Sequence, residues 1–131
     1  MDDAYKIEPR VREKVSENFY KDEFACPHCG VADIDSGLVQ KLQVLRTEIG
    51  RSLIINSGYR CQEHNDKIPH SSKNSSHIKG LAVDLSCTNG PDRYELIALC
   101  MKSFKRVGVY AGGWVHVDVD EDKPQNVMWV G

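Results

Sequence analysis

Three side chains have the types and the spacing to bind a metal ion together. His77 and Asp84 stand seven positions apart in the stretch SSHIKGLAVD, and His116 stands in the stretch WVHVD. Imidazole nitrogens and carboxylate oxygens are zinc ligands, and a catalytic zinc site keeps three of them while the fourth position stays open for water. Two neutral imidazoles and one carboxylate would give such a site a net charge of about +1, which acidifies the metal-bound water. On spacing alone, the same residues also fit an exposed loop histidine, a strand-end carboxylate and a half-buried histidine.

The strands expected around these residues would present the polar candidate side chains on one face of a sheet. Residues 80–86, GLAVDLS, alternate in polarity like a strand with two different faces, and Asp84 lies on the less apolar face. Residues 106–120, RVGVYAGGWVHVDVD, predict two strands around a Gly-Gly turn. In the second of these strands, His116 and Asp118 share one face because successive side chains alternate.

The remaining elements are predicted from caps and from helical spacing. Asp35 offers an N-cap to a helix over residues 36–49, whose apolar stripe ends before Gly50. Residues 91–104 begin with a proline and carry a second apolar stripe, which predicts a second core helix. Residues 9–19 have apolar side chains four apart, which suits a short amphipathic helix.

Two further segments complete the expected fold. Residues 52–57, SLIINS, have the branched apolar content of a buried strand. The long polar stretch 57–76 reads as a loop, and so long a loop in a small domain is usually functional or disordered. The sequence therefore predicts one α+β domain over residues 1–131, with a small, mainly antiparallel sheet and two or three helices packed on it.

Composition and charge exclude several classes of partner. The chain has 131 residues and a net charge of −2, which provides no basic field to attract nucleic acid or an anionic membrane. The longest apolar run is too short for a membrane span, and the acidic N-terminus lacks the apolar core of a secretory signal. We expect a protein that is made and kept in the cytoplasm, or that leaves by a route the sequence does not encode. The oligomeric state is not indicated.

Separated motifs of the sequence resemble one family of enzymes. The pattern S-x-H-x-x-G-x-A-x-D is met by Ser75, His77, Gly80, Ala82 and Asp84. Together with WVHVD, with SGYR at residues 57–60 and with EFACPHCG near the N-terminus, it resembles the zinc D-alanyl-D-alanine carboxypeptidase and L-alanyl-D-glutamate endopeptidase family, over residues 19–119. The last of these motifs is similar to the opening of small stand-alone phage and bacterial members.

The resemblance implies both a fold and an activity. Such enzymes share the α+β fold of the hedgehog signalling domain, and they cleave peptide bonds in the stem peptides of bacterial peptidoglycan. The implied Zn²⁺ ligands are His77, Asp84 and His116, and the ion polarises the scissile carbonyl and supplies the attacking water. Arg60 matches an arginine that contacts a substrate carboxylate or carbonyl and helps to stabilise the oxyanion, a task that suits the guanidinium fork.

The position of the general base departs from the family pattern. Several members carry a Glu or Asp three residues before the last histidine ligand, where this chain has Gly113. Asp118 shares the strand face of the last ligand and is the first candidate for the base, although it equally suits a partner that orients that histidine. His64 and His70 lie on the preceding loop and are further candidates. Where stand-alone members often have Gly-Gly, this chain has Pro69 followed by His70, which we expect to alter the loop.

The cysteines raise a separate question. Five cysteines cannot form a complete internal disulfide framework, so reduced thiols are the simpler interpretation. Cys26 and Cys29, in a C-P-H-C sequence, are half of a structural zinc site, which needs two further ligands. Cys61, Cys87 or Cys100 would have to contribute. Otherwise these are buried structural thiols, the default for free cysteine.

Two functions remain open from the sequence. The first is a zinc-dependent peptidoglycan peptidase, either a carboxypeptidase or an endopeptidase, carried by a phage or prophage and released to the wall by a separate lysis system. The second is a non-catalytic zinc-binding module of the same fold that recognises wall peptide or serves as a structural phage component. The glycine at position 113 is what keeps the second hypothesis open.

Overall fold

A five-stranded sheet organises the computed structural model, which describes residues 12–69, 71–87 and 89–131. The strands are β1 (Ile54–Ser57), β2 (Ala82–Ser86), β4 (Trp114–Asp118), β3 (Arg106–Tyr110) and β5 (Val127–Val130), in their order across the sheet. Neighbouring strands are antiparallel except for β3 and β5, which are parallel. The fold is therefore α+β with a mainly antiparallel sheet, as the sequence predicts.

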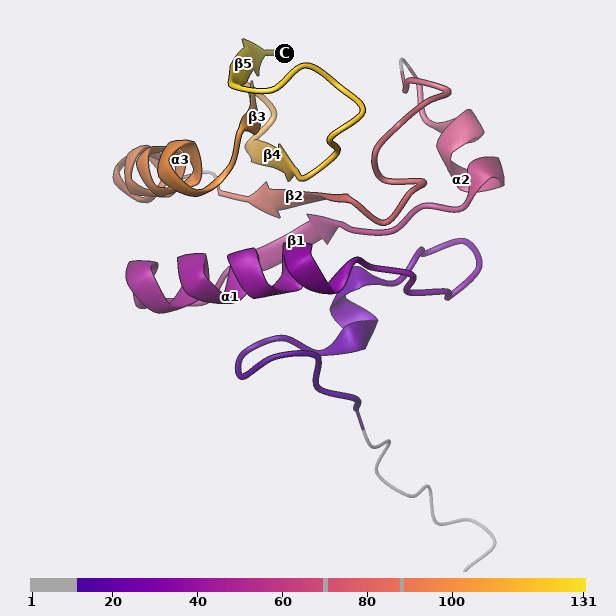
Figure 1. Cartoon of the computed structure of the whole chain (residues 1–131), viewed down its shortest axis with the longest axis horizontal. Coiled ribbons are helices and arrows are strands. Elements are labelled where there is room, and N and C mark those ends of the chain that lie inside the picture. Colours follow the sequence, from indigo (N-terminus) through magenta and orange to yellow (C-terminus); the bar gives the residue numbers. More distant parts are fainter. Residues whose placement is uncertain (1–11, 70, 88) are drawn as a thin grey trace, which may run out of the picture.

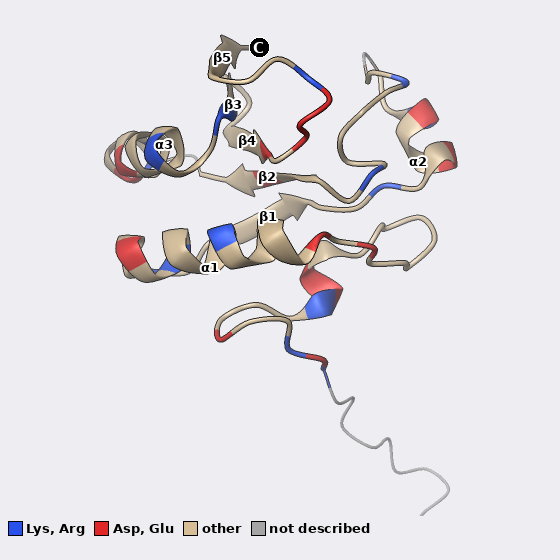
Figure 2. Cartoon of the chain, in the orientation of Figure 1, with Lys and Arg blue, Asp and Glu red and all other residues tan. Residues whose placement is uncertain are grey.

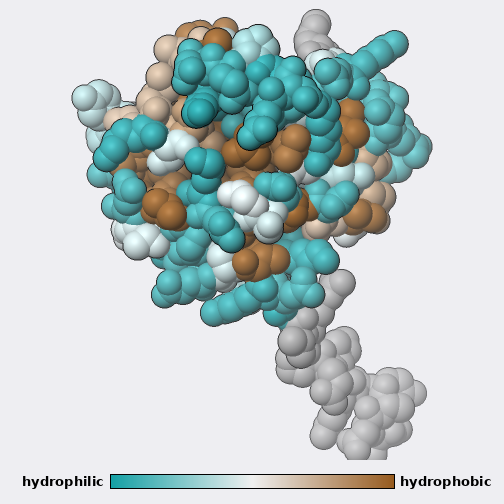
Figure 3. All heavy atoms as spheres, in the orientation of Figure 1, coloured by the Kyte–Doolittle hydropathy of each residue, from teal (hydrophilic) through white to brown (hydrophobic). Residues whose placement is uncertain are grey.

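The helices are α1 (Ser36–Ile49), α2 (Gln62–Lys67) and α3 (Gly90–Ser103), with a 3₁₀ turn, η2 (Lys21–Phe24), before them. The hydrophobic core lies between α1, α3 and one face of the sheet, where Val83, Leu85, Val115 and Val117 are buried. Figure 1 shows α2 and α3 on opposite sides of the molecule, and α2 directly follows the loop after β1. The space-filling view shows mostly hydrophilic side chains on the visible face (Figure 3).

Local capping explains why the two long helices begin and end where predicted. The Asp35 carboxylate accepts a hydrogen bond from the Leu38 amide, and Gly50 ends α1 with a φ of 72°, a left-handed conformation that glycine adopts without a Cβ clash. Asn89 caps α3 in the same way, through the Asp92 amide. Both predicted helices are confirmed to within one residue at each end. The strand predicted at 80–86 and the hairpin predicted at 106–120 are also present, although β2 begins two residues later, at Ala82, and β4 ends two residues earlier, at Asp118.

Two predictions for the first half of the chain are wrong in part. Residues 9–11 of the expected N-terminal helix lie outside the described residues, and residues 12–19 contain no helix. Phe19 instead packs against Phe24 in the core, with ring centroids 5.8 Å apart. Ile54 is 64% exposed because β1 is an edge strand, not the buried strand that its composition suggested. Tertiary packing overrides propensity in short segments.

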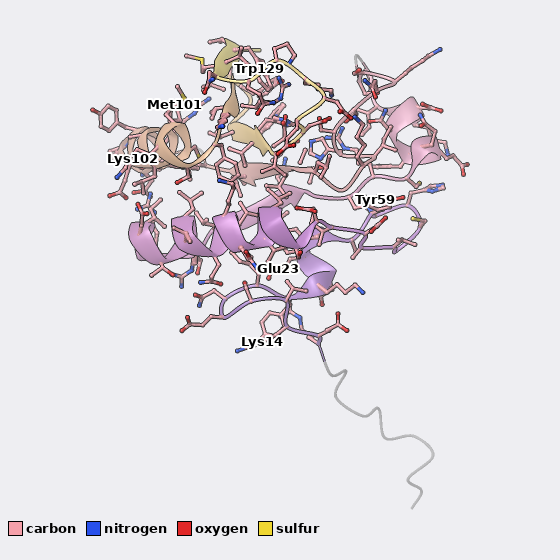
Figure 4. All side chains as sticks on the ribbon, viewed as in Figure 1. Lys14, Glu23, Tyr59, Met101, Lys102 and Trp129 are labelled. Carbon is pink, nitrogen blue, oxygen red and sulfur yellow. The ribbon has the colours of Figure 1, made fainter. Side chains whose placement is uncertain are left out.

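Two elements were not anticipated. The polar stretch 57–76 contains the short helix α2, for which the Cys61 side chain is the N-cap. The strand β5 extends the sheet beyond β3 and carries Trp129, labelled in Figure 4 at the end of the sheet opposite α1. Gly108 of β3 makes room for this indole, since a Cβ there would lie 2.6 Å from the Trp129 ring.

Candidate metal centre

The three predicted ligands meet on the face of the sheet that α1 and α3 leave uncovered. Asp84 of β2 and His116 of β4 are direct cross-strand partners in the antiparallel register, and His77 comes from the loop that enters β2. Asp84 Oδ1 lies 3.4 Å from His77 Nε2 and 3.0 Å from His116 Nδ1. All three ligand atoms lie within 4.8 Å of one another.

The backbone fixes His77 so that one ring nitrogen faces the site. Its Nδ1 donates a hydrogen bond to the carbonyl oxygen of Gly58, at 2.8 Å, so the lone pair is on Nε2. That nitrogen is buried and has no hydrogen-bond partner among the described residues. The loop turns into β2 at Gly80, whose φ is 71° and where a Cβ would lie 2.0 Å from the Asp33 carbonyl oxygen. An orphaned, inward-facing imidazole nitrogen is what a metal ligand requires.

His116 lies between two carboxylates. Its Nδ1 faces Asp84, and its Nε2 lies 2.7 Å from Asp118 Oδ2. Burial lowers the pKa of His116, but the hydrogen bonds with Asp118 and Asp84 outweigh it and raise the pKa above its ordinary value. Burial alone would raise the pKa of Asp84, whereas its contacts with His116 and His77 hold that pKa far below the usual range. The carboxylate is therefore ionised and able to serve as a ligand.

Asp118 is fully engaged with neighbouring groups. Oδ2 contacts the His116 ring, and Oδ1 accepts hydrogen bonds from Arg106 Nε at 2.8 Å and from the Asp120 amide at 3.1 Å. The residue is only 2% exposed. Burial raises its pKa, but these hydrogen bonds and the charge of Arg106 outweigh burial and lower it. Asp118 thus stands behind His116, where a carboxylate orients the ring and keeps the proton on Nε2.

Arg60 reaches the same site from the segment between β1 and α2. Its guanidinium donates to Ser57 Oγ at 3.0 Å and to Asp84 Oδ2 at 3.3 Å. Burial lowers the pKa of Arg60 and the charge of Asp84 opposes that shift. An arginine remains protonated in a protein, so a positive charge lies beside the three ligands.

A cavity of about 420 Å³ opens over the site, and its wall includes the three candidate ligands together with Arg60 and Asp118. Arg106 and Lys123 add two further cations to its wall. Figure 2 shows acidic residues along the loop between β4 and β5. Tyr110, Trp114 and Trp129 form an aromatic side of the cavity, with Trp129 5.4 Å from the His116 ring.

The wall of this cavity has no uncommitted carboxylate among the described residues. Asp84 and Asp118 are its acidic members, and both are held by neighbouring side chains. Gly113 ends the turn before β4 with a φ of 100°. His64 does not line the cavity, and His70 lies outside the described residues, although its neighbours Pro69 and Ser71 line it.

The residues present fit a tetrahedral zinc ion. Nitrogen and oxygen ligands about 2.0–2.1 Å from such an ion lie about 3.3 Å from one another. The two contacts of Asp84 Oδ1, at 3.4 and 3.0 Å, are close to that spacing. The donor set of two imidazoles and one carboxylate, with an outer carboxylate on one ring, is that of catalytic zinc sites.

Sequence reasoning missed Arg106 as part of the site, although the signal was present. The hairpin was predicted, and in the structure it pairs Val107 with Val117, which places Arg106 beside Asp118 at the next position of the ladder. No sequence pattern pointed to Gly58, because its carbonyl oxygen contacts His77, 19 positions later in the chain, only in the folded protein.

Comparison with known proteins agrees with the geometry. A search of curated proteins found no match. None of the described helices has the length and apolarity that a membrane crossing requires. The model of the family described as Peptidase M15 matches residues 17–118, a span that contains Arg60, all three candidate ligands and Asp118. This chain therefore belongs to the Peptidase M15 family, the zinc peptidases of D-alanyl-D-alanine carboxypeptidase type that its motifs resemble.

Proposed function

We propose that the protein is a zinc-dependent peptidase that cleaves peptide bonds in the stem peptides of bacterial peptidoglycan. The observation that carries this proposal is the buried His77 Nε2, which has no hydrogen-bond partner among the described residues and faces Asp84 and His116. When bound by these three side chains, a zinc ion polarises a scissile carbonyl and acidifies a water molecule. The proposed ligand set leaves room for that water because it has three members.

The cations of the cavity suit a peptide that carries a free carboxylate. Arg60, Arg106 and Lys123 line the wall, while the acidic members of the described wall are neutralised by direct partners. Arg60 is the one that lies against a metal ligand, so its guanidinium is placed to hold a substrate carboxylate or the developing oxyanion. Stem peptides of peptidoglycan end in such a carboxylate, which is why we favour them over internal protein segments.

Asp118 acts in this proposal as a positioning residue and not as the general base. Its two oxygens already accept hydrogen bonds from His116, Arg106 and the Asp120 amide, so it is not free to take a proton from water. Of the other bases named from the sequence, His64 does not line the cavity, so His70 is the remaining one to test. A phage origin, and delivery of a cytoplasmic product to the wall, remain part of the proposal.

The alternative is a zinc-binding module that recognises wall peptide without cleaving it. The specific observation in its favour is Gly113, together with the absence of an uncommitted carboxylate from the described cavity wall. The two functions share the metal site and differ only in turnover.

The deciding experiment is incubation of purified peptidoglycan with the zinc-loaded protein, with new amine termini and released peptides measured by mass spectrometry. The peptidase proposal expects products that disappear with a chelator and return on addition of zinc. His70→Ala and His70→Gln form a matched pair, in which loss of rate with retained zinc would identify this residue as the base. Protein that binds zinc and stem peptide but releases no product would establish the alternative.

A further inference from the structure

A second cluster of metal-binding side chains lies outside the cavity. The sulfur atoms of Cys26, Cys29 and Cys61 all lie within 4.8 Å of one another. None of the three lines the cavity that holds His77. Cys26 is buried and Cys61 is half-buried, while Cys29 is exposed, and all three are free thiols. Nothing in the peptidase chemistry uses them, so the cluster needs an explanation of its own.

The N-terminal half of the cluster is a tight turn. The Gly30 amide donates to the Cys26 carbonyl oxygen at 2.8 Å, and the Cys26 amide donates to the Val31 carbonyl oxygen at 2.7 Å. Gly30 has a φ of 77°, which brings the chain back on itself. This turn places Cys26 and Cys29 side by side, as two-cysteine halves of structural zinc sites require.

The distances within the cluster match a tetrahedral thiolate site. Two sulfurs about 2.3 Å from a tetrahedral zinc ion lie about 3.8 Å apart, and a sulfur and an imidazole nitrogen lie about 3.6 Å apart. The Cys26 and Cys61 sulfurs are separated by 3.7 Å, and Cys61 Sγ lies 3.5 Å from His28 Nδ1. A sulfur separation of 3.7 Å is far longer than a disulfide bond of about 2.05 Å.

Backbone amides point at two of the sulfurs. The Cys61 amide donates to Cys26 Sγ at 3.4 Å, and the His64 amide donates to Cys61 Sγ at 3.4 Å. N–H donors of this kind favour the thiolate, which is the form that binds metal. Cys61 is also the N-cap of α2, so this sulfur lies at the end of the short helix where amides are unpaired.

A fourth ligand is available from a pair of histidines. The rings of His28 and His64 stack beside the sulfurs, with centroids 6.3 Å apart. His28 supplies the nitrogen nearest to Cys61, while His64 follows Cys61 by the same three-residue spacing that separates Cys29 from Cys26. One imidazole from this pair would complete the set of three sulfurs and one nitrogen that structural zinc sites commonly use.

We propose that Cys26, Cys29 and Cys61, with one imidazole of the His28 and His64 pair, bind a structural zinc ion. The ion ties the turn after η2 to the start of α2, two segments 35 positions apart in the chain. The segment it holds is the one that positions the other site, because Tyr59 donates its amide to Phe24, and the Arg60 amide donates to the His77 carbonyl oxygen. Figure 4 labels Tyr59 on this segment, on the side of the molecule where α2 lies.

The test uses the full chain, purified under reducing conditions without chelator, and measures zinc per chain by elemental analysis. We expect about two zinc ions for the parent protein and about one for His77→Ala/His116→Ala. Cys29→Ser, a change at an exposed side chain, should also leave about one, whereas the matched control Cys87→Ser should retain both. Zinc content that Cys29→Ser leaves unchanged would overturn the proposal.

Cobalt substitution separates this proposal from the function of the other site. Thiolate ligands give Co²⁺ an intense near-ultraviolet charge-transfer band, which imidazole and carboxylate ligands do not. The band should persist in His77→Ala/His116→Ala and disappear in Cys29→Ser, whether or not the protein cleaves peptidoglycan. A parent protein without the band refutes the thiolate site. His28→Ala/His64→Ala should weaken zinc affinity by more than the roughly 10- to 100-fold that loss of an outer partner causes, and parent-like affinity would refute the imidazole ligand.

Discussion

The molecule contains two clusters of candidate metal ligands that differ in chemistry and in surroundings. The first, His77, Asp84 and His116, lies in a cavity on one face of the sheet, with orienting partners behind two of its members. The second, with its three cysteines, lies outside that cavity and links a turn to a helix N-terminus. Three nitrogen and oxygen ligands leave an open position for chemistry, whereas three sulfurs and a histidine close the shell. Under the two proposals, the first cluster is a site for chemistry and the second ties two segments of the chain together.

The largest expected effect comes from removing a ligand of the first cluster alone. His77→Ala should abolish one zinc site and lower the rate of peptide cleavage at least about a thousandfold, since metal assistance is worth several kcal/mol. The cysteine cluster should keep its thiolate-cobalt band. The comparison between the clusters fails if His77→Ala also removes that band, because the sites would then not be independent.

Substitution of Arg60 tests whether a positive charge beside the first cluster assists peptide cleavage. Arg60→Ala removes the guanidinium beside Asp84 and should lower the rate about 100- to 1000-fold, the loss seen when one oxyanion donor is removed. Arg60→Lys restores the charge without the fork and should recover only part of the rate. Arg46→Ala, on α1, is the control and should turn over like the parent. Parent-like kinetics for Arg60→Ala would leave this residue with no role in the reaction.

Asp118 distinguishes an orienting carboxylate from a general base. Asp118→Asn preserves the shape but weakens the hold on His116 Nε2, so we expect about a 10- to 100-fold loss of zinc affinity, measured by competition with a chelator. At saturating zinc much of the rate should return. Asp122→Asn, an exposed neighbour, is the matched control. Full zinc affinity combined with a lost rate would instead make Asp118 the base.

The smallest effect concerns the loop after β4, which belongs to neither cluster. Asp120 is buried and accepts hydrogen bonds from Ser76 and Lys79. Burial raises its pKa, but these partners outweigh burial and lower it, so the folded protein binds this proton less readily than the unfolded chain does. The stabilisation is therefore present above the unfolded pKa of 3.8 and is lost as pH falls through the lower folded value.

The expected result for Asp120→Asn follows from that direction. The free energy of unfolding should fall by about 1–3 kcal/mol at pH 7, and the deficit should shrink as the pH drops below about 4. Denaturant unfolding at several pH values measures it, with Asp122→Asn as the control. Both metal sites should remain loaded at pH 7. A deficit that grows towards low pH would mean that the folded pKa of Asp120 is not lowered.

Much of the site could be predicted because strand alternation and pairing are local rules. Period-two alternation puts His116 and Asp118 on one face, whereas the place of Arg106 beside Asp118 follows from the observed register, in which Tyr110 pairs with Trp114. The two capped helices could be predicted equally well, since helix caps and apolar stripes depend only on residues close together in the chain. The edge position of β1 and the strand β5 were not, because both depend on which strands end up as neighbours.

The sequence by itself determined the residue types, the faces on which they lie and the family to which they belong. Only the tertiary structure decided what each group does next to its partners. In the structure, the candidate base Asp118 accepts hydrogen bonds from three donors. The tautomer of His77 is fixed by a hydrogen bond to a carbonyl oxygen 19 positions earlier in the chain. The tertiary structure also chose Cys61 from three possible partners for Cys26 and Cys29. These outcomes rest on contacts between segments distant in the chain, which short-range patterns of polarity and spacing do not encode.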